Sequence, residues 1–91
     1  MITFAVETRY HLDKLADVRP KHRAYLQALV DEGKVLAGGP FVDGDSGFAI
    51  YRVADRAELD ELLAVDPYTT DGVAAERTVR EWTIVLGPWA Q

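Results

Sequence analysis

The spacing of apolar residues alternates along this chain between a period of two and a period of about 3.6 residues, and the order of these changes constrains the fold most. Ile2, Phe4 and Val6 alternate with other residues, which is the period of a strand. Pro20 suits the first turn of a helix, because its missing N–H is not needed there. One face of this predicted helix is marked by His22, Tyr25, Leu26, Leu29 and Val30.

The next segment has the pattern of a hairpin. Gly33 is suited to end the helix, and we predict that it does so in the left-handed conformation. The apolar run Val35-Leu36-Ala37 predicts a second strand that ends at Gly38-Gly39-Pro40. Residues 43–47 have the composition of a turn, and residues 48–53 predict a third strand.

A second helix and a last strand complete the chain. Asp55 followed by Glu58 resembles a capping box at a helix start. Pro67 ends this helix, because the residue before a proline is pushed out of the helical region. The last strand is predicted from about Arg77 to Leu86. The buried face of the second helix is marked by Leu59, Leu62 and Leu63.

The order strand–helix–strand–strand–helix–strand predicts an α+β fold of the ferredoxin-like βαββαβ type. Such a fold has an antiparallel sheet in the order 4-1-3-2 with two helices on one face. A chain of 91 residues has enough material for one core, so we expect a single domain over residues 1–91. The third strand is apolar on both sides, with Phe48 and Ile50 on one and Ala49 and Tyr51 on the other. We therefore expect the open face of the sheet to pack against a second copy in a homodimer.

Charge and composition exclude several classes of function. The chain has 10 basic and 15 acidic residues, a net charge of −5, which argues against nucleic-acid or anionic-membrane partners. It has no cysteine and only two histidines, so we expect neither a disulfide framework nor a metal site. No apolar run reaches the roughly 20 residues of a membrane span, and the N-terminus lacks the order of a signal peptide. We therefore expect a cytoplasmic protein.

Two polar residues stand where the helical period predicts apolar ones. His22 is on the apolar stripe of the first helix, in its predicted first turn, and Asp66 extends the stripe of the second. The predicted topology brings the start of one helix and the end of the other to the same end of the sheet. We therefore predict hydrogen-bond contact between His22 and Asp66 in a concave site near Gly39, Pro40 and Tyr68.

These residues have a chemical and a structural interpretation. Asp66 would orient His22 as a general base or acid, and backbone N–H groups near Gly39 would bind an enolate-like oxygen. Alternatively, His22 and Asp66 simply satisfy each other and cap helix ends. Arg19 either faces an anionic substrate at the same rim or is an ordinary surface arginine, and Tyr68 either lines the pocket or packs in the core.

The chain resembles the YCII-related domain family over nearly its whole length. The resemblance is carried by Arg19, His22, Tyr25-Leu26, Leu29, Gly33, Leu36, Gly39-Pro40, Gly47, Asp66-Pro67-Tyr68 and Gly72. It implies a dimeric α/β barrel, in which two ferredoxin-like sheets pack face to face. It also implies a His–Asp pair, at His22 and Asp66 here, and chemistry without a cofactor on small cyclic or aromatic-degradation intermediates, by isomerisation or elimination of halide.

Three functions follow from these observations. The leading hypothesis is a small cofactor-independent lyase or isomerase that uses His22 and Asp66. The first alternative is a ligand-binding or regulatory module that has the same pocket without chemistry. The second is a cofactor-free monooxygenase, which is suggested by analogy of fold alone.

Overall fold

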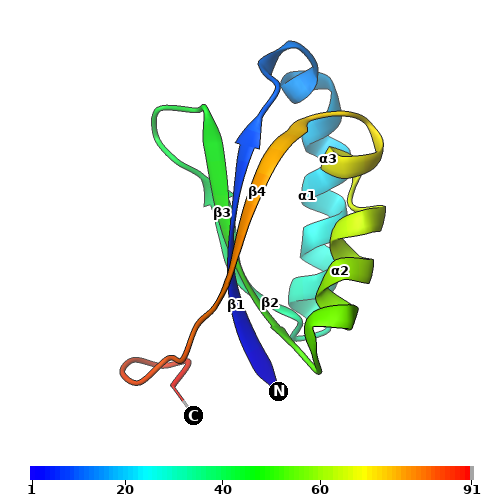
Figure 1. Ribbon diagram of the computed structural model, residues 1–91. Helices are drawn as coiled ribbons and strands as arrows, with labels where there is room; N and C mark the ends of the chain where they lie inside the picture. Colours follow the sequence, from blue (N-terminus) through cyan, green and yellow to red (C-terminus); the bar gives the residue numbers. More distant parts are fainter. Residues whose placement is uncertain (91) are drawn as a thin grey trace.

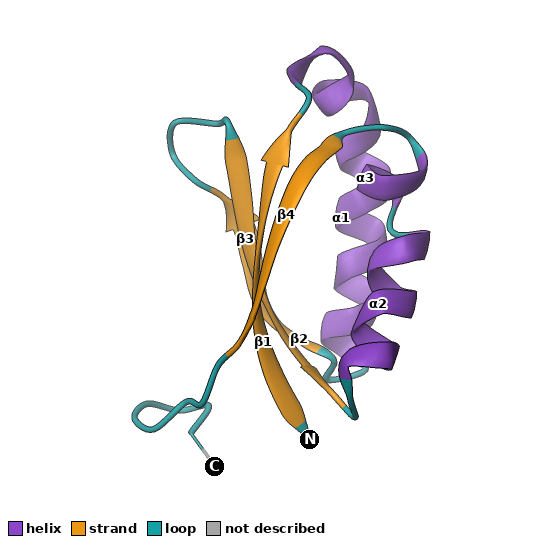
Figure 2. Ribbon diagram, in the orientation of Figure 1, coloured by secondary structure: helices purple, strands orange, loops and turns teal. Residues whose placement is uncertain are grey.

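A computed structural model describes residues 1–90 as one twisted antiparallel sheet with helices on one side (Figures 1 and 2). The strands are ordered β2-β3-β1-β4, which confirms the predicted α+β, ferredoxin-like arrangement. None of the helices in the described part of the chain is long and apolar enough to cross a membrane. The elements are β1 (Ile2–Tyr10), the short 3₁₀ helix η1 (Leu12–Lys14), α1 (Leu15–Asp31), β2 (Val35–Pro40), β3 (Ser46–Val53), α2 (Arg56–Val65), α3 (Pro67–Thr70) and β4 (Ala74–Glu81).

The main core lies between the sheet and the helices α1 and α2. On β1 and β3, the paired residues Phe4 and Tyr51 are both buried and face the helices, as the period of two requires. The Tyr25 hydroxyl donates to the carbonyl oxygen of Leu62 at 2.7 Å and joins α1 to α2. We call the buried residues of this region the core cluster: Phe4, Val6, Leu29, Val35, Ala49, Tyr51, Val53, Leu59 and Leu63.

The first helix begins earlier than the sequence predicts. α1 starts at Leu15, so Pro20 lies inside it and His22 is not in its first turn. A proline there removes one backbone hydrogen bond. Val18, which is buried, and Leu15, which is partly buried, pack into a second apolar cluster and stabilise the added turn. The partial positive charge at the N-terminus of a helix acts mainly within its first turn. It therefore does not act directly on the His22 side chain.

The second helix begins and ends as predicted, but Asp66 lies outside it. The Asp55 carboxylate accepts from the backbone N–H of Glu58 at 2.8 Å, which confirms the capping interaction. α2 ends at Val65, and Asp66 has the extended ψ of 130° that a following proline favours. The predicted place of Asp66 on the stripe of α2 is therefore wrong. Pro67 also begins α3, a short helix that the apolar spacing did not indicate.

The hairpin forms as predicted, with β2 ending at Pro40 and β3 beginning two residues earlier than expected, and Gly33 behaves as expected. β2 includes Gly38-Gly39-Pro40, which pair with residues 47–49 of β3, and β3 begins at Ser46. Backbone pairing does not depend on side chains, so the glycines continue the ladder although their apolar pattern has ended. Gly33 has a φ of +77°, which confirms the predicted left-handed helix end.

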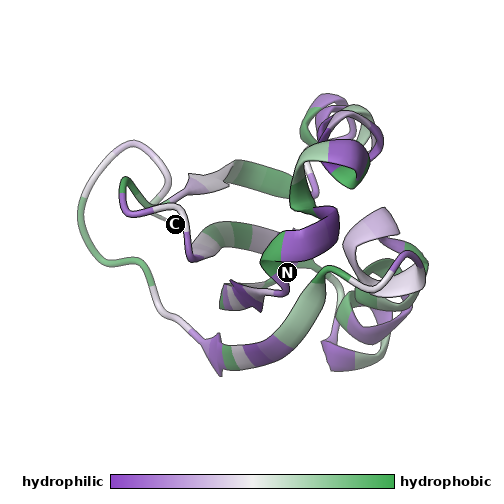
Figure 3. Cartoon of the chain, turned by 90° about the horizontal axis from the view of Figure 1, so that it is seen from above, coloured by the Kyte–Doolittle hydropathy of each residue, from purple (hydrophilic) through white to green (hydrophobic). Residues whose placement is uncertain are grey.

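The last strand is displaced toward the N-terminus, and the chain after it crosses to the open face of the sheet. β4 ends at Glu81 and not near Leu86. The backbone N–H of Trp82 donates to the Thr3 carbonyl, and the Arg52 guanidinium donates to the carbonyl of Trp89. Figure 3 shows this tail, residues 82–90, on the side opposite the helices. Ile50 points to the open face, yet it is only 3% exposed. The chain's own tail therefore covers part of the face that we expected a second copy to cover.

Candidate active site

The site is built around the corner between α2 and α3. Asp66 is the N-cap of α3, and its Oδ1 accepts from the backbone N–H of Tyr68 at 2.8 Å. Pro67 follows at the first helical position, where its fixed φ favours the helix. The Asp66 side chain is only 1% exposed, so this carboxylate needs partners inside the protein.

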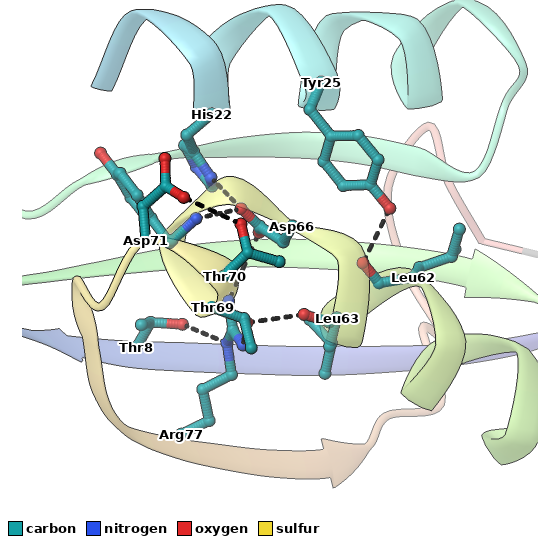
Figure 4. A network of polar contacts seen from close by, with 11 residues as sticks. Thr8, His22, Tyr25, Leu62, Leu63, Asp66, Thr69, Thr70, Asp71 and Arg77 are labelled. Carbon is teal, nitrogen blue, oxygen red and sulfur yellow. Dashed lines mark hydrogen bonds and ion pairs between the residues drawn. The ribbon is translucent and has the colours of Figure 1, made fainter. Parts of the chain in front are cut away.

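The structure brings His22 and Asp66 into direct contact. The Nδ1 atom of His22, on α1, lies 2.8 Å from Oδ1 of Asp66 (Figure 4). An ionised carboxylate can only accept, so Nδ1 carries the hydrogen and, in the neutral ring, Nε2 carries the lone pair. Nε2 has no hydrogen-bond partner within residues 1–90, and the His22 side chain is 17% exposed. The arrangement is thus suited to accept a proton at Nε2.

Arg77, which was not among the residues predicted for the site, completes the surroundings of the Asp66 carboxylate. Its Nη2 atom lies 3.4 Å from Oδ2 of Asp66, and its Nε donates to the Thr8 hydroxyl at 3.1 Å. A further guanidinium nitrogen donates to the Thr69 hydroxyl (Figure 4). The signal available in the sequence was that Arg77 has the same strand parity as Val79, which packs against the core cluster.

One tyrosine packs against the histidine, and a second tyrosine packs against the first. The rings of Tyr68 and His22 are stacked, with 3.6 Å between their centroids and 2° between their planes. Tyr10 meets Tyr68 edge-on at 5.4 Å. The stacking fixes the plane of the imidazole, while Asp66 fixes its rotation. We call the second buried cluster, which supports these rings, the corner cluster: Tyr10, Val18, Tyr68 and Val73.

A cleft of about 270 Å³ opens between α1 and the sheet beside the His22–Asp66 contact. The glycine at position 47 makes room at its floor, because a Cβ there would come within 2.0 Å of the Tyr10 hydroxyl. Within the described part of the chain, no group of three histidine, cysteine, aspartate or glutamate side chains is placed to hold a metal ion. Every residue predicted for the site lines the cleft: Arg19, His22, Gly39, Pro40, Asp66 and Tyr68.

The four-stranded antiparallel sheet with its helices on one face defines a ferredoxin-like α+β domain, of the class found in dimeric α/β barrels. Solved structures have this fold. One is the 5-chloro-2-hydroxyhydroquinone dehydrochlorinase (TftG) from Burkholderia phenoliruptrix, in complex with 2,5-dihydroxybenzoquinone. It matches with a TM-score of 0.77 and 24% identity, and the match covers 88% of this chain and 92% of that one. Another is an antibiotic biosynthesis monooxygenase, with a TM-score of 0.62 and 22% identity over 94% of this chain and 100% of that one. At these identities the likeness concerns the fold.

The family is defined by sequence. The YCII-related domain model matches residues 1–83. Protein YciI from Escherichia coli O6:H1 is 36% identical over an alignment 97 positions long, which covers 93% of this chain and 97% of the relative. Protein YciI from Shigella flexneri matches to the same extent. The chain belongs to the YCII-related domain family, as its sequence resemblance predicted.

Proposed function

We propose that this protein is a small cofactor-independent enzyme of the lyase or isomerase type, with His22 as its proton-transfer group and Asp66 as the residue that orients it. The observation that carries the proposal is the contact between His22 Nδ1 and Asp66 Oδ1 at 2.8 Å, which leaves Nε2 available beside the cleft. Asp66 is itself held by the Tyr68 backbone and by Arg77. A base held on both sides loses little orientational freedom when the substrate reacts.

The proposed chemistry is the transfer of one proton. Nε2 of His22 takes a proton from a C–H or O–H group of the bound ring, and the electron pair moves into the conjugated system toward an oxygen of the substrate. In an isomerisation, the protonated Nε2 returns the proton to a different carbon. In an elimination, the electron pair forms a new double bond in the substrate as the carbon–halogen bond breaks, the halide leaves with the electrons of that bond, and the protonated Nε2 releases its proton to water. Neither reaction needs an oxidant or a reductant.

The size and lining of the cleft support a small ring as the substrate. A space of about 270 Å³ holds one ring with its substituents, and Tyr10 and Tyr68 contribute aromatic surface to its wall. The dehydrochlorinase with the same fold is described in complex with a substituted benzoquinone. We assign substrate contacts to Arg19, Gly39, Pro40 and Tyr68, all of which line the cleft.

The proposal is tested with chlorinated hydroxyhydroquinones and unsaturated lactones as trial substrates. Chloride release and ultraviolet spectra would follow the two reactions, with His22→Gln as the test variant and His11→Gln as its control. His11 is exposed and precedes η1, outside the cleft. Turnover that is lost in the first variant and kept in the second supports the proposal. Turnover that survives His22→Gln overturns it.

A ligand-binding module is the second candidate, and one observation favours it. Asp66 caps α3, so its contact with His22 has a structural use even without chemistry. This candidate predicts that ligands of the cleft bind without being converted, in the original protein and in His22→Gln alike. The monooxygenase alternative has only the fold in its favour.

We also propose that the protein is a homodimer that is formed through the open face of the sheet. Phe41, Phe48 and Trp82 are 43%, 38% and 44% exposed, and all three line a shallow apolar groove on that side. Phe48→Asp should give a monomer by light scattering, whereas Val65→Asp, at an exposed apolar position on α2, should not. A monomer in the original protein at micromolar concentration would contradict the proposal.

A further inference from the structure

Two arginines at the cleft have no acidic partner among residues 1–90. Arg19 and Arg23 lie one turn apart on α1 and both line the cleft. Neither has a carboxylate within ion-pair distance among residues 1–90. By contrast, Arg56 on α2 and Arg9 on β1 each have one, at 2.8 Å and 3.8 Å. The chain has an excess of five acidic residues, so acidic partners for the cleft arginines are not scarce.

The accessible charge inside the cleft is therefore positive. Asp66 is the one carboxylate among the described residues that line it, and its side chain is 1% exposed. Its oxygens already accept from His22, from the Tyr68 backbone and from Arg77. A ligand entering the cleft thus meets two free guanidinium groups and no free carboxylate, which favours an anion.

A neutral donor lies near the same two arginines. The Tyr10 hydroxyl lines the cleft above Gly47 and has no hydrogen-bond partner among residues 1–90. Burial raises the pKa of Tyr10, although Arg19 and Arg23 are close enough to oppose this shift. The phenol therefore keeps its proton at neutral pH and can donate a hydrogen bond to a ligand.

We propose that the cleft selects small organic anions, with the anionic group held by Arg19 and Arg23 and a ring oxygen accepting a hydrogen bond from Tyr10. A planar carboxylate matches the fork of a guanidinium better than any neutral group does. The inference rests on the proposed function in one respect: it names the ligand class of the same cleft. It requires no chemistry at His22.

Calorimetric titration with a matched pair of probes tests this selectivity. The probes are 2,5-dihydroxybenzoate and its neutral analogue 2,5-dihydroxybenzamide. We expect the dissociation constant of the acid to be at least about tenfold lower than that of the amide. This preference should weaken in high salt. The double variant Arg19→Gln/Arg23→Gln should bind both probes within about twofold of each other. Arg56→Gln removes the same kind of charge outside the cleft and should keep the preference.

Tyr10→Phe tests the neutral donor. It should weaken the binding of 2,5-dihydroxybenzoate by about two- to tenfold and leave the binding of unsubstituted benzoate unchanged. Equal losses for both acids would overturn the assignment of Tyr10.

The anion proposal fails if acid and amide bind equally, if neither binds, or if the preference survives in the double variant. These outcomes are distinct from a failure of the proposed enzyme. That failure would appear as a complete lack of turnover in a protein that still prefers the acid. Conversely, His22-dependent turnover of neutral substrates with no preference for the acid would keep the enzyme and overturn the anion selectivity.

Discussion

The two ends of the layer between sheet and helices are built on different principles. The core cluster, under α1 and α2, consists of apolar side chains and a tyrosine, and Val53 and Leu59 are fully buried in it. The corner cluster, under α3, supports a buried carboxylate, an imidazole and a guanidinium. Burial of apolar area stabilises the core cluster. The corner cluster instead holds polar groups in fixed orientations. One end therefore supplies stability and the other supplies a site.

The largest effect should come from emptying the core cluster. Leu59→Ala removes a side chain that is 0% exposed, and we expect the free energy of unfolding to fall by about 2–5 kcal/mol. Urea denaturation measures this loss. Leu12→Ala, at a position that is 56% exposed, is the control and should change stability by less than about 0.5 kcal/mol. If Leu59→Ala costs no more than its control, the division between the two ends is wrong.

A change at the corner should cost less stability and reveal the polar design. Asp66→Ala removes the cap of α3 and the acceptor of His22 and Arg77, and we expect a loss of about 1–3 kcal/mol. Asp66→Asn keeps an oxygen for the Tyr68 N–H and should recover part of this loss. Thermal unfolding of both variants is the measurement. If they prove equally unstable, the charge of the carboxylate outweighs its capping role.

The close approach of β3 to Tyr10 can be tested separately. Gly47→Ala places a Cβ within 2.0 Å of the Tyr10 hydroxyl, and we expect a loss of about 1–3 kcal/mol. Adding Tyr10→Phe removes the clashing oxygen and should restore part of the stability. Gly39→Ala, where an added Cβ has no neighbour within 4 Å, is the matched control. Equal effects at the two glycines would show that the corner yields more easily than the geometry indicates.

The smallest effect concerns pH at the core end of α2. The Ala54 backbone N–H and the Lys34 ammonium hold the pKa of Glu58 below its usual value of 4.5. A lowered pKa contributes stability that is complete above pH 4.5 and is lost as the pH falls through the folded value. Glu58→Gln should therefore reduce the acid sensitivity of unfolding slightly, relative to Glu61→Gln at an exposed position on the same helix. An unchanged acid slope would contradict this reading of the cap.

Local patterns in the sequence were enough to predict the sheet and the approximate place of the site. The period of two in β1 follows directly from burial of alternate side chains, and the Asp55 cap follows from local hydrogen bonding. The contact between His22 and Asp66 followed from topology, because both residues were assigned to the correct end of the sheet.

Features that depend on tertiary contacts could not be predicted in this way. The early start of α1 depends on Val18 packing against residues far along the chain, so Pro20 was a misleading signal. The strand parity of Arg77 with Val79 indicates the side on which it lies, but its contact with Asp66 depends on the register of β4 against β1, which local patterns do not determine. The strand pattern continues to about Leu86, yet β4 ends at Glu81 and the tail that follows is held over the open face by contacts with Thr3 and Arg52.

The double use of Asp66 has a consequence for the history of such domains. This aspartate closes one helix boundary and opens the next, so a related chain without the proposed reaction would still need it to make the turn. Among the described residues, His22 caps no helix. Its side chain contacts the Asp66 carboxylate and the Tyr68 ring and otherwise borders the cleft. When related chains are compared, an aspartate at this corner therefore reports only on architecture. The histidine is the position at which we expect a different residue in a related chain that lacks the proposed reaction.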